Sequence, residues 1–131
     1  MKKILCFTAL LSLLFLEACK KDSTGNDGPV VIRYDFTSTT AGNFNIETVA
    51  DGATFVATLY TVSWTSTVNS NSNSGTNTTS FTVFPPNNWA GTANVADVTL
   101  KIFVNNVEKS AGTAHFIGLD RPNGITVTTT Y

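Results

Sequence analysis

Apolar and polar residues alternate with a period of two along most of the chain after residue 29. Ile32, Tyr34 and Phe36 fall on one side of an extended segment, with polar residues between them. This period predicts half-buried strands, and it recurs over residues 43–47, 80–85, 96–104, 107–112, 113–119 and 125–131. Residues 54–68 form one longer β-prone run, in which we expect the buried face to switch near Tyr60 to Val62.

Turn-forming residues separate these segments. We expect turns at Thr39–Asn43, at Asp51-Gly52 and at 120–124, and a two-residue hairpin turn at Asn105-Asn106. The tract 69–79, which is rich in Asn, Ser and Thr, predicts an exposed loop.

Seven or eight short strands at regular spacing, with no helical periodicity, predict an all-β fold. The expected architecture is an antiparallel two-layer β-sandwich of the immunoglobulin-like type, formed by one domain over residues 30–131. Trp64, in the long run, is the predicted centre of its core.

The first 19 residues follow a different pattern. Two lysines precede an apolar run, residues 4–15, which is too short to span a bilayer permanently and is typical of a secretion signal. Leu16-Glu17-Ala18-Cys19 resembles the lipobox of bacterial lipoproteins, with Glu17 departing from the small or apolar residue usual there. The resemblance implies that residues 1–18 are cleaved as a signal peptide and that Cys19 is acylated, anchoring the chain to the membrane.

Residues 19–29 contain almost nothing apolar after Cys19 and predict a flexible tether. The charged residues after Cys19 resemble the export tag of Bacteroidota-type surface lipoproteins, and Asp22-Ser23-Thr24 resembles an O-glycosylation signature of those bacteria. We therefore expect a lipid-anchored protein of the outer membrane, on its periplasmic or its exposed face. With Cys6 cleaved away and Cys19 acylated, the mature chain keeps no free thiol.

Three segments, in this order, resemble small Bacteroidota-type lipoproteins that carry an MmpS-like, immunoglobulin-type domain. They are residues 31–36, 64–68 and 98–106. The resemblance implies an envelope lipoprotein without catalytic residues, and in mycobacterial relatives an accessory to a lipid transporter.

The sequence offers little catalytic chemistry. It has no Gly-x-Ser-x-Gly motif, and its single histidine, His115, has the alternation of a solvent-facing strand residue. One histidine and no mature cysteine are too few for a zinc site, and no pattern pairs two carboxylates for glycoside hydrolysis. A calcium site using Asp51, Asp97 or Asp120 is a minor alternative, because their spacing lacks the Asp/Asn ladder of calcium loops. We expect no enzyme, cofactor or metal site.

Trp89 is the candidate ligand contact. It lies in Pro85-Pro86-Asn87-Asn88-Trp89, where a loop could present its ring for stacking on a sugar; the favoured interpretation is that it folds back as a plug over the open end of the sandwich. Phe84 and Phe103 have the parity opposite to the core, so they either cover a second layer or form a contact surface for a partner.

These observations predict a non-enzymatic, membrane-anchored interaction or binding module whose ligand the sequence does not identify. The alternatives are a carbohydrate-binding accessory that uses Trp89 and an MmpS-like transport accessory. A formal net charge of -1, with 13% charged residues, indicates no nucleic-acid partner.

Overall fold

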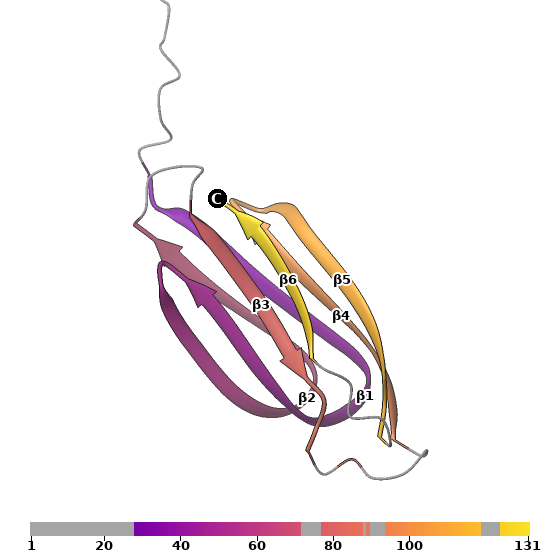
Figure 1. Cartoon of the computed structure of the whole chain (residues 1–131). Helices are drawn as coiled ribbons and strands as arrows, with labels where there is room; N and C mark the ends of the chain where they lie inside the picture. The colour runs from indigo at the N-terminus through magenta and orange to yellow at the C-terminus, as the bar shows by residue number, and fades with distance from the viewer. Residues whose placement is uncertain (1–27, 72–76, 88, 90–93, 119–123) are drawn as a thin grey trace, which may run out of the picture.

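The structure is a computed structural model that describes residues 28–71, 77–87, 89, 94–118 and 124–131. The predicted signal peptide, Cys19 and the tether up to residue 27 lie outside the described residues. The described chain contains strands and no helix (Figure 1), which confirms the all-β class. Its six strands are β1 (Val30–Ala50), β2 (Ala53–Ser70), β3 (Thr78–Phe84), β4 (Val95–Val104), β5 (Val107–Ile117) and β6 (Ile125–Thr130).

All six strands belong to one antiparallel sheet. β2 pairs with one side of β1 along almost the whole length of that strand. On the other side of β1, β4 pairs with residues 32–38 and β3 pairs with residues 45–49. β5 adds to β4 and β6 adds to β3. The sheet curls until β5 and β6, the two ends of this order, contact each other and nearly close a barrel (Figure 1).

Two predicted breaks do not end a strand, so six strands replace the predicted seven or eight. Residues 39–43 are not a turn but part of a bulge inside the continuous strand β1. Gly112 does not end a strand either: a Cβ atom there would lie 2.7 Å from Val127 Cγ1, so the glycine permits β5 to approach β6 closely. The immunoglobulin-like form of the sandwich is not confirmed.

β1 and β2 bend together at this bulge. Thr37 pairs with Ser63 and Gly42 pairs with Thr61, so Val62 alone lies opposite residues 38–41. Within β2, the more buried side chains change from odd positions (57, 59, 61) to even positions (64, 66, 68, 70). The face switch predicted near Tyr60 to Val62 is therefore confirmed, and it lets both halves of one hairpin face the same core.

The core lies inside the curled sheet. The alternation predicted for β1 is confirmed, since Ile32, Tyr34 and Phe36 are buried and outward neighbours are not. Phe36 meets Phe44 edge to face, with ring centroids 4.9 Å apart. Trp64 is only partly buried at the border of this cluster, so its predicted place at the centre was wrong. The fully buried aromatic side chains are Tyr34, Phe36, Phe44, Phe81 and Phe116.

Both predicted two-residue turns are confirmed. Asp51 and Gly52 have φ angles of 51° and 74°, and Asn105 and Asn106 have φ angles of 50° and 66°. Positive φ at both central positions is the geometry that lets a tight turn follow the twist of the flanking strands. The exposed loop predicted over 69–79 was wrong at its ends, where Ser70 and Thr79 are buried. Residues 72–76 of that loop, and most of the turn predicted at 120–124, lie outside the described residues.

Candidate functional site

His115 and Asp97 form an exposed pair across β5 and β4. His115 Nδ1 lies 2.6 Å from Asp97 Oδ1, and more than half of each side chain is exposed to solvent. His115 thus lies on the surface, as its alternation predicted. A solvent-exposed pair of this kind contributes about 0–1 kcal/mol to stability.

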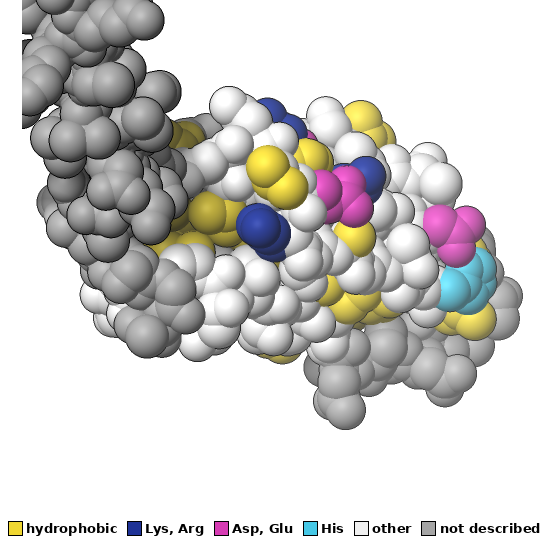
Figure 2. All heavy atoms as spheres, turned by 90° about the horizontal axis from the view of Figure 1, so that it is seen from above, with side chains coloured by type: hydrophobic (Ala, Val, Ile, Leu, Met, Phe, Trp, Pro, Cys, Tyr) yellow, Lys and Arg dark blue, Asp and Glu magenta, His cyan; other side chains and the backbone are white. Residues whose placement is uncertain are grey.

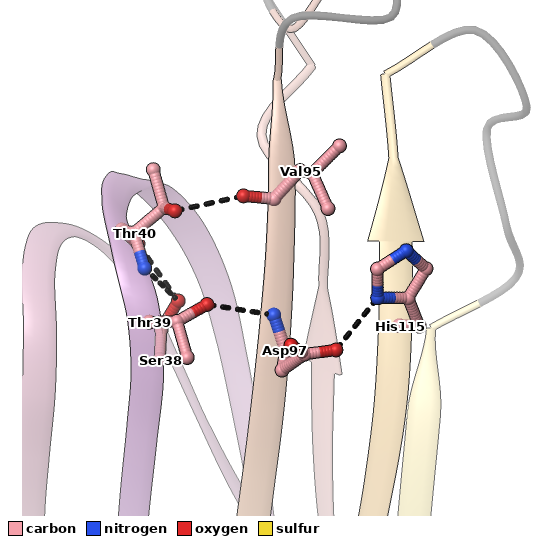
Figure 3. Close-up of polar contacts among 6 residues, drawn as sticks. All are labelled: Ser38, Thr39, Thr40, Val95, Asp97 and His115. Carbon is pink, nitrogen blue, oxygen red and sulfur yellow. Dashed lines mark hydrogen bonds and ion pairs between the residues drawn. The ribbon is translucent and has the colours of Figure 1, made fainter.

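The bulge of β1 is attached to β4 beside this pair (Figure 3). Thr39 Oγ1 accepts a hydrogen bond from Asp97 N (2.9 Å), and Thr40 Oγ1 donates one to the carbonyl oxygen of Val95 (2.7 Å). Ser38 Oγ donates to the carbonyl oxygen of Thr40 (2.7 Å). The hydroxyl groups of Thr39 and Thr40 hold the bulge to β4, where the regular ladder of β1 has ended, and the Ser38 hydroxyl bonds within the bulge. The arrangement explains the polar cluster as a structural attachment of the bulge.

Asp51 joins three distant parts of the fold. Its Oδ1 accepts hydrogen bonds from Tyr131 Oη (2.5 Å) and Ser70 Oγ (2.8 Å), and its backbone N–H donates to Tyr131 Oη (3.1 Å). Burial, followed by the hydrogen bond to Asp51, raises the pKa of Tyr131 above its ordinary value. This contact stabilises the turn between β1 and β2.

The calcium alternative gains no support from the described residues. Among them, no three His, Cys, Asp or Glu side chains lie close enough together to hold a metal ion. Asp51 and Asp97 make the hydrogen bonds given above, and Asp120 lies outside the described residues.

Trp89 packs against the core. Its ring meets Phe44 edge to face, with centroids 5.6 Å apart, and the side chain is half-buried. A Cβ atom on Gly42 would lie 2.9 Å from Trp89 Cζ2 and 2.7 Å from Pro86 Cγ, so the glycine makes room for both rings. This position favours the plug interpretation, and binding of a sugar to Trp89 stays a prediction.

Phe84 and Phe103 differ in their surroundings. Phe103 is partly covered by Arg33, whose guanidinium carbon lies 4.0 Å from the ring centroid, an arrangement typical of a cation–π contact. Arg33 Nε also lies 3.2 Å from Asp35 Oδ1. Phe84, by contrast, is 40% exposed at the end of β3.

β2 carries the largest set of exposed apolar side chains in the described part of the chain. Val56 is 65% exposed, Tyr60 74% and Val62 48%, and all three lie on or beside the outer face of the strand. Phe55, 50% exposed, points inward and stacks on Trp64 with ring centroids 6.3 Å apart. The two halves of β2 thus meet at the opening of the core, beside a shallow apolar recess lined by Thr48, Ala50, Ala53, Thr54, Phe55 and Val68.

β2 is also an uncharged edge. No Asp, Glu, Lys, Arg or His occurs between Asp51 and Asp97, a stretch that includes all of β2 and β3. Among the described residues, β2 pairs only with β1, so one side of this 18-residue strand has no strand partner. Edge strands of soluble proteins are commonly protected by charges, proline or short length, and β2 has none of these protections. This edge was not recognised from the sequence, although the missing charges were a signal for it.

The charged side chains do not form a patch of one sign on the face seen in Figure 2. Basic and acidic side chains there lie close to one another among uncharged groups. One ion pair of the described residues joins Lys101 Nζ and Glu108 Oε2, which are 2.8 Å apart. The absence of a nucleic-acid partner stays a prediction.

Comparison with protein-family models, curated proteins and solved structures finds no match to this chain. The part of the chain that the structure describes contains no helix with the length and hydropathy needed to cross a membrane. The contacts of the described residues are therefore the basis for any functional proposal.

Proposed function

We propose that the chain is a non-enzymatic lipoprotein of the cell envelope, held at the membrane by an acylated Cys19, that works as a binding module through β2. An immunoglobulin-type, MmpS-like relationship is part of this proposal. It rests on the resemblance of residues 31–36, 64–68 and 98–106, which fall in β1, β2 and β4 with its turn.

The observation that supports binding through β2 is an exposed apolar strand with a free, uncharged edge. A strand edge presents backbone N–H and C=O groups, which an added strand can satisfy, while side chains such as Tyr60 provide contact area. Tyrosine is enriched in protein interfaces because it combines apolar area with a polar group.

The anchor is tested by replacing Cys19. We expect labelled palmitate to be incorporated into the wild-type chain and lost in Cys19→Ala, because the thiol is the acylated group. Two or three acyl chains contribute about 0.8 kcal/mol per buried CH₂, so the variant should also leave the membrane fraction. Cys6→Ala is the matched control and should be labelled like the wild type. Equal labelling of Cys19→Ala and wild type would contradict the proposal.

Binding through β2 is tested by a photoreactive amino acid at position 60 in living cells. We expect a covalent adduct of defined mass at position 60, because Tyr60 is the most exposed large apolar side chain of β2. The control carries the same photoreactive residue at Val107, which is 55% exposed on β5. If neither position, or both equally, gave adducts, β2 would not be the binding surface.

A further inference from the structure

The backbone groups on the free edge of β2 follow from the hydrogen-bond pattern of its neighbours. Ala50 and Ala53 close the two-residue turn, and such closing residues exchange both backbone hydrogen bonds. Hydrogen-bonded and non-hydrogen-bonded pairs alternate in an antiparallel ladder. The odd-numbered residues from Ala53 onward therefore bond to β1, and the even-numbered residues point their N–H and C=O away from β1. These outward groups belong to Thr54, Val56, Thr58 and Tyr60.

The second half of β2 has the opposite parity. The carbonyl oxygen of Val31 accepts a hydrogen bond from Asn105 N (2.8 Å), so odd residues of this part of β1 bond towards β4 and even residues bond towards β2. The partners of those even residues, such as Val68 opposite Ile32, are even as well. The backbone groups that face the free edge in this half and have no partner among the described residues therefore belong to Thr65, Thr67 and Asn69. Those of Ser63 are taken up by Thr61, because Ser63 N donates to Thr61 Oγ1 (3.0 Å) and Thr61 Oγ1 donates to the carbonyl oxygen of Ser63.

The geometry points to a second copy of this chain as the partner, with the two β2 strands paired antiparallel about a two-fold axis beside Thr61 and Val62. This register places the bend of one strand against the bend of the other. It sets the outward backbone groups of the first half opposite those of the second half, in the pairs Thr54–Asn69, Val56–Thr67 and Thr58–Thr65. Nearer the axis, Tyr60 lies opposite Ser63, whose backbone groups bond to Thr61 Oγ1, so the ladder is interrupted there. This register pairs even-numbered residues of the first half with odd-numbered residues of the second half. In a regular strand such residues would point their backbone groups to opposite sides, so the register requires the change from even to odd at the bend.

The side chains fit the same register. Residues directly opposite each other in an antiparallel pair lie on one face, and here the inward residues meet inward residues, as Phe55 meets Val68 and Leu59 meets Trp64. The outward residues Val56 and Tyr60 likewise meet the outward residues Thr67 and Ser63.

The absence of charge on the strand permits pairing with its own copy. Like charges directly opposite each other destabilise a strand pair, and a strand paired with itself about a two-fold axis brings identical residues close together. β2 has no charged residue, so self-pairing creates no such repulsion. The paired β2 strands would join the sheets of the two copies, with the first half of each β2 beside the second half of the other. Neither copy would then keep an unprotected edge at β2.

This inference deepens the proposed function, on which it rests, by naming the partner of β2. Its test is the mass of the purified full-length protein, measured by sedimentation in density-matched detergent. We expect the wild type to sediment as two copies. Val62→Lys and Val62→Glu should each dissociate about tenfold more readily, since residue 62 lies beside its own copy at the two-fold axis, and a mixture of the two variants should recover the wild-type affinity.

Val107→Lys is the matched control, because Val107 has similar exposure but lies on β5, and its mass should equal that of the wild type. A wild-type protein that sediments as one copy, or a Lys and Glu mixture that stays dissociated, would overturn the inference. An adduct at position 60 to a different protein, with a single-copy wild type, would overturn the inference and leave the proposed function standing.

A second measurement uses a disulfide in the membrane-bound chain. Val62→Cys should form a two-copy species on mild oxidation, and Val107→Cys should form much less. Val56→Pro in the Val62→Cys background should lower the yield several-fold, because proline removes a free-edge N–H opposite Thr67 and leaves the hydrogen bonds to β1 intact. Equal yields at positions 62 and 107 would indicate random collision and count against the dimer.

Discussion

Phe44→Ala is expected to lower the free energy of unfolding by about 3–5 kcal/mol, as measured by urea denaturation. Phe44 is fully buried and its ring contacts both Phe36 and Trp89, so truncation removes apolar contacts and leaves a cavity between β1 and the segment after β3. Because a domain of this size is stable by only about 5–15 kcal/mol, the variant should lose a large part of the stability of the fold.

Phe84→Ala is the matched control for this change. Phe84 lies in β3 and is 40% exposed, so truncation should cost about 1 kcal/mol or less. If both variants lost equal stability, the core would not lie inside the curled sheet. The fluorescence of Trp89 reports the same contact. Its change on unfolding, identified as the part of the signal that Trp89→Phe lacks, should become smaller in Phe44→Ala.

Tyr131→Ala is expected to cost about 3 kcal/mol, since it removes a buried ring and its hydroxyl hydrogen bonds to Asp51. The backbone N–H of Tyr131 still donates to the carbonyl oxygen of Asn77 (2.9 Å). Tyr131→Phe keeps the ring and should cost only about 1 kcal/mol, which separates packing from hydrogen bonding. Equal losses in the two variants would mean that the hydroxyl, and not the ring, carries the effect.

The same tyrosine makes stability depend on alkaline pH. Burial raises the pKa of Tyr131, and burial also raises that of Tyr34, whose hydroxyl is hydrogen-bonded to Thr79 (2.6 Å). A raised pKa in the folded state means that the folded chain binds more protons, so the contribution is complete below about pH 10 and is lost as the pH rises through the folded-state value. Tyr131→Phe should therefore lose less stability than the wild type between about pH 8 and about pH 11. A steeper loss in the variant would contradict this assignment.

Local patterns predicted much of the fold. The period of two placed Ile32, Tyr34 and Phe36 in the core, and Asp51-Gly52 and Asn105-Asn106 marked their turns, because alternation and positive φ depend on neighbours in the sequence. Gly42 and Gly112 misled the strand count, since glycine marks both a turn and a place where another segment comes close. Only the packing of Trp89 on Gly42 and of Val127 on Gly112 distinguishes the two.

The sequence by itself determined the all-β class, the two tight turns, the buried face of β1 and the change of face in β2. It also carries the prediction of an anchor at Cys19, which lies outside the described residues. Only the tertiary structure decided that β1 runs through its bulge, that Trp64 lies at the border of the core, and that β2 is left with a free edge. The physical reason is that strand order depends on contacts between residues far apart in the chain, which no local period encodes.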